Sequence, residues 1–241
     1  MTVEEETGVI VILDALGTKG IWNRVKDVKK YVESWEELTS SWKENYESPG
    51  ENDDFQNKLI AFSDTIIIKN TGKNLSSVLT AAAHNVALVM LEAISQGIYL
   101  RGCMSVGQIF SSDKMIIGKA IDEAAEYHTM PNWAGISVSP SVYNMVKQMR
   151  KEKKLNGKYN ETIFTDYDIP LKIGVEKGIA INYPSRLDLG WGKNVYKENF
   201  GVSKKHELVE IFENELNSIT DLGASLKIRN TIEFLKYVSC K

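Results

Sequence analysis

The sequence predicts an α+β fold in which helices cover one face of a mainly antiparallel sheet. A run rich in Val and Ile at residues 8–13 has the pattern of a strand buried on both faces. Apolar residues at three- and four-residue steps, as from Ile21 to Trp42, indicate amphipathic helices. Because pairs of adjacent strands alternate with helices along the chain, an antiparallel sheet is favoured over a parallel one.

The elements are expected in a fixed order. They are a strand at 8–13, a helix over 21–42, a hairpin over 59–69 that turns near Ser63 and Asp64, a helix over 75–93 stopped by Gly97, a hairpin of 98–110 with 114–118, and a helix over 118–128. A strand at 135–139, a helix at 140–149 entered through Pro140, an exposed basic stretch at 150–161, β structure at 169–184 and helices at 204–219 and 224–238 follow. We expect one domain over 1–241, with a core at 8–145 and a C-terminal elaboration at 150–241.

Composition favours a soluble, cytoplasmic protein. The 241 residues carry 29 basic and 32 acidic side chains, a net charge of −3, so no general attraction to nucleic acid is expected. The N-terminus has neither the basic nor the apolar region of a secretory signal. Uninterrupted apolar runs are far below the ~20 residues that span a bilayer. Cys103 and Cys240 lie too far apart in the sequence to indicate a disulfide framework.

Two aspartates interrupt otherwise apolar segments. Asp14 closes the first predicted strand in "VIVILDALGTKG", and Asp64 lies at the bend of "IAFSDTIIIK". An ionised carboxylate in such a place is costly unless it is paired or binds a cation, and two converging carboxylates favour a divalent metal. The alternative is that each aspartate only caps a turn or a helix start.

The residues around these aspartates resemble class III nucleotidyl cyclases. "LDALG" resembles the end of that family's first strand, "FSDTIII" its second metal aspartate, "RGCMSVG" its fourth strand and "GKAIDEAAEY" its next helix start, in matching order over residues 8–145. The compact chain looks most like the stand-alone pyrimidine cyclases of bacterial anti-phage (Pycsar) systems. The resemblance implies a palm-like (ferredoxin-like) sheet and a head-to-tail homodimer with composite active sites.

The resemblance also implies the chemistry. A ribose 3′-hydroxyl attacks the α-phosphorus of a nucleoside triphosphate and pyrophosphate leaves, with two Mg²⁺ or Mn²⁺ ions per active site. Asp14, Asp64 and the carbonyl of Ala15 are then metal ligands. Leu16, Gly17, Thr18 and Lys19, in a glycine turn, are expected to wrap the β- and γ-phosphates. Lys19 has the alternative of a solvated loop lysine.

Two departures from the family pattern bear on activity. Purine cyclases place an Asn and a transition-state Arg in the helix after the fifth strand, and these positions hold Asp122 and Glu126 here. An ionised carboxylate cannot donate a hydrogen bond, so another cation must replace that Arg or the chain is inactive. Arg101 and Lys119 are the nearest substitutes. Arg101 can instead be a salt-bridge partner at a strand end.

By the same resemblance, the positions at which purine-specific cyclases contact the base are held by Ile60 and Met115 here. Neither side chain can hydrogen-bond a purine edge, which disfavours ATP and GTP and is compatible with UTP or CTP. The leading prediction is therefore a cyclase that makes a cyclic pyrimidine mononucleotide, a second messenger in phage defence. The main alternative is a non-catalytic nucleotide sensor or dimerisation module with the same fold. A palm-domain polymerase or diguanylate-type synthase is disfavoured, since no Gly-Gly-Asp/Glu turn is present.

Overall fold

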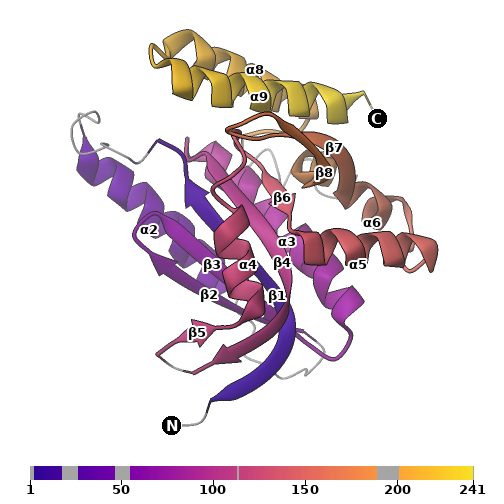
Figure 1. Ribbon diagram of the computed structural model, residues 1–241. Helices are drawn as coiled ribbons and strands as arrows, with labels where there is room; N and C mark the ends of the chain where they lie inside the picture. Colours follow the sequence, from indigo (N-terminus) through magenta and orange to yellow (C-terminus); the bar gives the residue numbers. More distant parts are fainter. Residues whose placement is uncertain (1–2, 18–26, 47–54, 113, 189–200, 241) are drawn as a thin grey trace.

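The computed structural model describes residues 3–17, 27–46, 55–112, 114–188 and 201–240. Its strands are β1 (Glu4–Ala15), β2 (Gln56–Phe62), β3 (Thr65–Thr71), β4 (Leu100–Ser111), β5 (Ile116–Ile117), β6 (Ile136–Val138), β7 (Phe164–Pro170) and β8 (Val175–Ile181). Its helices are α2 (Val28–Tyr46), α3 (Leu75–Ser95), α4 (Lys119–Tyr127), α5 (Pro140–Lys151), α6 (Lys158–Ile163), the 3-10 helix η1 (Tyr183–Asp188), α8 (Lys205–Ser218) and α9 (Leu222–Ser239) (Figure 1).

The strands form one sheet in the order β2-β3-β1-β4-β6-β8-β7, with β5 added to β4. The pairing of β4 with β6 is parallel, and the other strand pairs are antiparallel. The predicted α+β class with a mainly antiparallel sheet is confirmed. Most elements lie within a few residues of their predicted positions, including the turn between β2 and β3 at Ser63 and Asp64.

Some boundaries differ from the prediction, such as the start of β7 at Phe164 where β structure was expected from residue 169. β1 begins at Glu4 because the polar residues 4–7 pair with residues 108–111 of β4. The basic stretch predicted to be an exposed excursion contains the buried Leu155 and the start of α6. The predicted start of the first helix, from Ile21 to Val25, lies outside the described residues.

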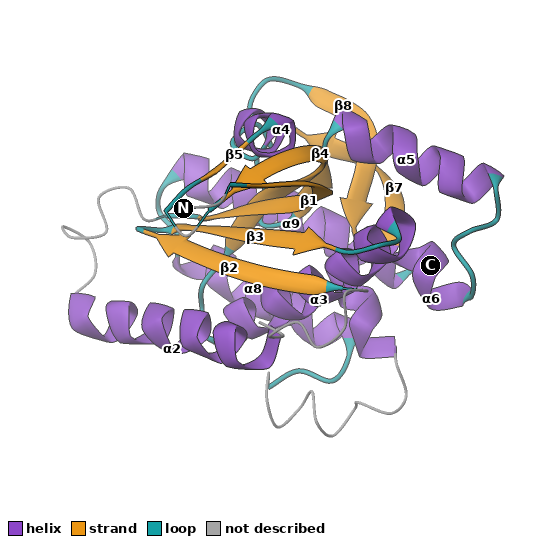
Figure 2. Ribbon diagram, turned by 90° about the horizontal axis from the view of Figure 1, so that it is seen from below, coloured by secondary structure: helices purple, strands orange, loops and turns teal. Residues whose placement is uncertain are grey.

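Alternate residues of β1 point to opposite faces of the sheet. Val9, Val11 and Leu13 belong to the large hydrophobic core, which α2 and α3 cover. Ile10 and Ile12 belong to a small second cluster, which α4 covers through Ala120 and Ala124. Figure 2 shows α4 on one side of the sheet and α2 and α3 on the other. The prediction of helices on one face therefore holds for α2 and α3 but is wrong for α4. We call the α4 side of β2, β3, β1 and β4 the open face.

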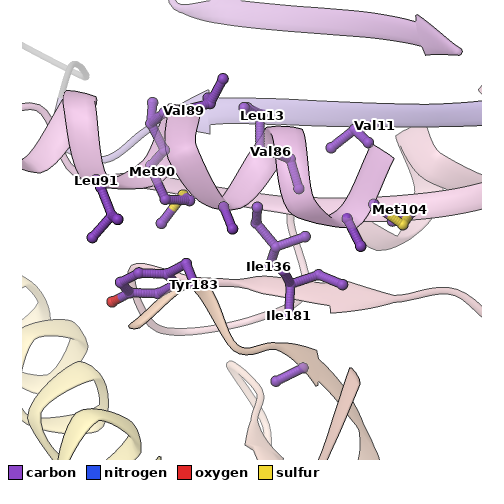
Figure 3. Packing of buried hydrophobic residues seen from close by; sticks show 14 of the residues in the cluster. Val11, Leu13, Val86, Val89, Met90, Leu91, Met104, Ile136, Ile181 and Tyr183 are labelled. Carbon is purple, nitrogen blue, oxygen red and sulfur yellow. The ribbon is translucent and has the colours of Figure 1, made fainter. Parts of the chain in front are cut away.

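Helix α3 is the central helix of the large core. It is long and apolar enough, by length and composition alone, to cross a membrane, contrary to the expectation from uninterrupted apolar runs. Its apolar side chains, however, pack against the sheet: Val86, Val89 and Met90 face β1, as Figure 3 shows. We therefore interpret α3 as the core helix of a soluble domain.

The C-terminal elements share this core. Trp133 stacks on Tyr167 of β7 at 5.4 Å between ring centroids and meets Phe234 of α9 edge-on at 4.6 Å. Phe234 also contacts Tyr183 of η1, at 5.9 Å. Because aromatic side chains bury large apolar areas, this group fixes α9 across one end of the sheet (Figure 1).

Candidate active site at the ends of β1 and β4

The two predicted metal aspartates lie on neighbouring strands. Asp14 is opposite Thr65 in the antiparallel pairing of β1 with β3, so Asp64 lies one residue beyond its cross-strand partner. The backbone amide of Ala15 donates to the carbonyl of Asp64 at 3.0 Å. Ser63, the first residue of the two-residue turn, has a φ of 57°, as the first position of a type II′ hairpin turn requires.

Both carboxylates act on the same phenol. Tyr31 of α2 is half-buried, and burial raises the pKa of its hydroxyl above the ordinary value. The negative charges of Asp64 and Asp14 raise that pKa further. A single side chain is therefore within the electrostatic range of both carboxylates. Asp14 and Asp64 thus lie at neighbouring strand ends, both near Tyr31.

Arg101 contacts the first aspartate directly. Its guanidinium donates from Nη2 at 2.9 Å and from Nε at 3.2 Å, both to Oδ2 of Asp14. Its Nη1 donates to the carbonyl of Thr129 at 3.2 Å. The side chains are 13% and 18% exposed, so this ion pair is little screened by water. Of the two interpretations of Arg101, the structure contains the salt bridge.

This ion pair leaves room for a cation at Asp14. Both bonds from Arg101 reach Oδ2, and no described residue gives Oδ1 a hydrogen bond or an ion pair. No group of three or more His, Cys, Asp or Glu side chains among the described residues could form a metal cage. The donor set therefore fits Mg²⁺ or Mn²⁺, which bind through one or two carboxylates and substrate phosphates. Asp14, through Oδ1, and Asp64 would hold such an ion.

The predicted phosphate loop is only partly available. The amide of Leu16 donates to the carbonyl of Tyr99 at 2.7 Å, and the amide of Ala15 is bonded to Asp64. These two amides cannot also donate to a phosphate, so the prediction is wrong for the amide of Leu16. Gly17 has a φ of +86°, a backbone conformation that favours glycine. Thr18 and Lys19 lie outside the described residues.

The predicted base-contacting and cationic residues separate into two groups. Ile60 lies opposite Ile67, and Ile67 opposite Ile12, so Ile60 shares the open face with Asp14. Met115 lies beyond the far end of β4, about 35 Å along that strand from Arg101 at about 3.3 Å per residue. Within one chain, the structure does not bring Met115 to the aspartates.

Lys119 belongs to the second group. A Cβ built on Gly107 would lie 3.7 Å from the Cβ of Lys119, which places Lys119 about 20 Å along β4 from Arg101. Lys119 is exposed at the first residue of α4, as are Asp122 and Glu126 later in that helix. Asp122 lies in the first turn, where a carboxylate favours the helix dipole. Within one chain Lys119 therefore cannot replace the missing transition-state arginine at Asp14.

Sequence reasoning missed two residues near Asp14. Tyr31 is one step away from the apolar stripe of α2 and carries no motif. Lys227 of α9 is far along the chain, but the charges of Arg101 and Asp14 both act on it. Only the packing of α2 and α9 on the sheet brings either residue to the aspartates, so no local sequence signal could have identified them.

Comparison with known proteins finds similar solved structures, all of low sequence identity. No family model and no curated protein matches this chain. Among solved structures, an adenylate/guanylate cyclase/hydrolase from Silicibacter pomeroyi is 17% identical, with a TM-score of 0.44, over 75% of this chain and 96% of that one. The guanylyl cyclase Cya2 is 10% identical, with a TM-score of 0.46, over 75% and 93% of the two chains.

A third structure is a class III adenylyl cyclase-like ATP-binding protein from Pseudomonas aeruginosa. It is 12% identical, with a TM-score of 0.44, over 66% of this chain and 38% of its own length. Because these TM-scores are below 0.5, we base the function below on the residues of this chain.

Proposed function

We propose that this chain is a nucleotidyl cyclase that converts a pyrimidine nucleoside triphosphate, UTP or CTP, to its 3′,5′-cyclic monophosphate and pyrophosphate. The observation that carries the proposal is the placement of two carboxylates, Asp14 and Asp64, at adjoining strand ends where both act on Tyr31. By its resemblance to the Pycsar cyclases, we place the product in phage defence as a second messenger.

One chain supplies the residues that would hold the metal ions of a two-metal cyclase. Divalent ions held there would polarise the α-phosphate and favour ionisation of the 3′-hydroxyl. Asp14 and Asp64 supply the negative charge that holds such ions next to the phosphates. Arg101 keeps Asp14 in place through Oδ2, and no described residue forms a hydrogen bond with Oδ1. In the reaction a bond forms between the ribose O3′ and the α-phosphorus, the bond to the β-phosphate oxygen breaks, and the 3′-hydroxyl loses its proton.

We propose that the active form is a head-to-tail homodimer. Asp14 and Arg101 lie at one end of the open face, with Asp64 in the adjoining turn, whereas Lys119 and Met115 lie toward the other end of β4. A two-fold axis that makes two open faces antiparallel brings the first group of one chain to the second group of its partner. The distance between these two groups prevents one chain from completing the site. In a site composed of two chains, the same distance places each group next to the other group of the partner.

The preference for a pyrimidine follows from the apolar open face next to the aspartates. Ile60, Ile67 and Ile12 form a row across three strands, in which Ile60 and Ile67 are partly exposed and Ile12 is buried under α4. A row of isoleucines offers a base van der Waals contact and no hydrogen bonds, so it cannot reward the polar edge of a purine. A smaller ring stacked on this row is the ligand that suits it.

The test is product formation from each of the four ribonucleoside triphosphates with Mg²⁺ or Mn²⁺. We expect a cyclic product from UTP or CTP, and Asp64→Asn should lower turnover about 10³-fold or more, because it removes a metal ligand. Asp168→Asn, which changes an exposed carboxylate of β7, is the charge-matched variant with an intact metal pair. Absence of cyclic product from all four nucleotides at high enzyme concentration would refute the proposed cyclase activity. Full activity of Asp64→Asn would refute the proposed role of Asp64 as a metal ligand.

A non-catalytic nucleotide sensor is the second candidate. The Asp14–Arg101 ion pair favours it, because an arginine bonded to a metal ligand competes with the metal for charge. The carboxylates Asp122 and Glu126 in place of an Asn and an Arg favour it as well. Calorimetry discriminates between the two: a sensor binds the triphosphate and returns it unchanged, whereas a cyclase releases pyrophosphate.

A further inference from the structure

Three residues of distant sequence origin donate hydrogen bonds to the segment 129–132, next to Asp14. Arg101 donates to the carbonyl of Thr129 at 3.2 Å. The amide of Lys172, in the turn after β7, donates to the carbonyl of Met130 at 3.1 Å. On the other side of the segment, Asn230 of α9 donates to the carbonyl of Asn132 at 2.8 Å. The segment is therefore held between β4, the β7–β8 turn and α9.

Lys227 lies on the face of α9 that contacts this segment. Thr231 accepts a bond from the amide of Ala134 at 2.8 Å and donates to the carbonyl of Lys227 at 2.8 Å. Residues three and four positions apart share a helix face, so Lys227 is on the same side as Asn230 and Thr231. Side chains of a helix lean toward its N-terminus, and the ammonium of Lys227 lies within the electrostatic range of Arg101 and Asp14.

Two cations and two carboxylates act on Lys227, and the cation Arg101 acts most strongly of the four. Burial lowers the pKa of its ammonium, and the nearby guanidinium of Arg101 lowers it further. Lys172 acts in the same direction, against the carboxylates Asp221 and Asp14. No described residue forms a hydrogen bond or an ion pair with Nζ of Lys227. A half-buried ammonium without a carboxylate contact, beside a second and a third cation, attracts an anion.

We propose that Lys227, with Arg101 and Lys172, binds the phosphate groups of the nucleotide beside Asp14. This inference rests on the proposed function, and it gives the C-terminal elaboration a role in the same site. It also addresses the amide lost from the predicted phosphate loop, since the amide of Leu16 is already bonded to Tyr99. The cation that α4 lacks at Asp122 and Glu126 is thereby supplied by α9 of the same chain.

The test is binding of inorganic tripolyphosphate to the full chain, in the presence of Mg²⁺, by calorimetry. Lys227→Met should weaken binding about tenfold or more, as expected for a lost hydrogen bond to a charged group. Arg229→Met is the matched control, because it removes one charge from the same helix at an exposed position. Lys227→Arg should restore most of the affinity. Thermal unfolding of all variants checks that each is folded.

The outcomes separate this inference from the proposed function. Equal affinity of wild type and Lys227→Met, or no binding by either, overturns the role of Lys227. An equal loss in Arg229→Met also overturns it, since the effect is then one of net charge. If binding depends on Lys227 but no cyclic product forms, the inference stands and the cyclase fails. If wild type makes product and Lys227→Met has an unchanged kcat/KM, the cyclase stands and the inference fails.

Discussion

The two faces of β1 differ in what they contribute. The residues Val9, Val11 and Leu13 are completely buried under α2 and α3, in a core that extends to the C-terminal helices. On the open face, Ile10 and Ile12 pack only against the small cluster under α4, and the strand then ends at Asp14.

Charged groups also occur on the open face, whereas the core side of β1 carries none from Thr7 to Ala15. Asp14 pairs with Arg101 at one end, and Lys69 pairs with Glu6 and with Ser111 at the other. A sheet face covered by two helices must be apolar, whereas a face covered by one short helix can hold ion pairs and a ligand. Stability and function are thus carried by alternate residues of one strand.

Truncating one residue on each face of the sheet tests this division of roles and should give the largest effect. Leu13→Ala should lower the free energy of unfolding by about 2–5 kcal/mol, because it leaves a cavity in the fully buried core. Ile60→Ala removes a half-buried side chain from the open face and should cost less, while raising KM for the nucleotide. Denaturant unfolding and steady-state kinetics of both variants give the answer. Equal stability losses would contradict the division between the faces.

The fold was largely predictable because its signals are local. The apolar run from Leu59 to Lys69, interrupted at Ser63 and Asp64, predicted a hairpin that turns there, although no Asn-Gly or Gly-Gly marks the turn. The periodic apolar residues of α3 and its stop at Gly97 were likewise visible in sequence. The early start of β1 was not, because Glu4–Thr7 are polar and become a strand only through backbone pairing with β4.

The site was predictable in part for the same reason. Asp14 and Asp64 each interrupt an apolar run, which is a local signal of a special role. Whether Arg101 pairs with Asp14, and whether the amide of Leu16 is free, depends on strands and carbonyls that only tertiary packing brings close. Lys227 comes close to Asp14 because α9 packs against the end of the sheet, and no sequence pattern around residue 227 predicts that packing.

The second test concerns the Asp14–Arg101 ion pair at the end of the open face. Arg101→Met leaves Asp14 with a little-exposed, unpaired carboxylate, so we expect a loss of about 1–3 kcal/mol of stability in metal-free buffer. Adding Mn²⁺ should then raise the unfolding temperature more in this variant than in wild type, since the cation replaces the lost positive charge.

Arg150→Met is the control for Arg101→Met, because Arg150 pairs with the exposed Asp166 away from the aspartate pair. We expect it to lose less stability and to gain no additional stabilisation from Mn²⁺. If Mn²⁺ stabilises Arg101→Met no more than it stabilises wild type, Asp14 does not bind the ion and the metal assignment fails.

The smallest expected effect lies on the core side, where His84 of α3 joins the first 145 residues to the C-terminal elements. Its ring bonds to Asn160 of α6 at 2.9 Å and to Arg186 of η1 at 3.3 Å. Burial lowers the pKa of His84 below its ordinary value, Arg186 lowers it further, and the bond to Asn160 opposes both.

Because the folded state holds His84 neutral, the unfolded state binds more protons below about pH 6.5, the ordinary histidine value. We therefore expect the free energy of unfolding to fall as the pH is lowered from about 6.5 toward the folded-state pKa, and His84→Gln to reduce that slope. His206→Gln, at an exposed position of α8, is the control. A slope unchanged by His84→Gln would show that the contact between α3 and the C-terminal elements does not sense protonation.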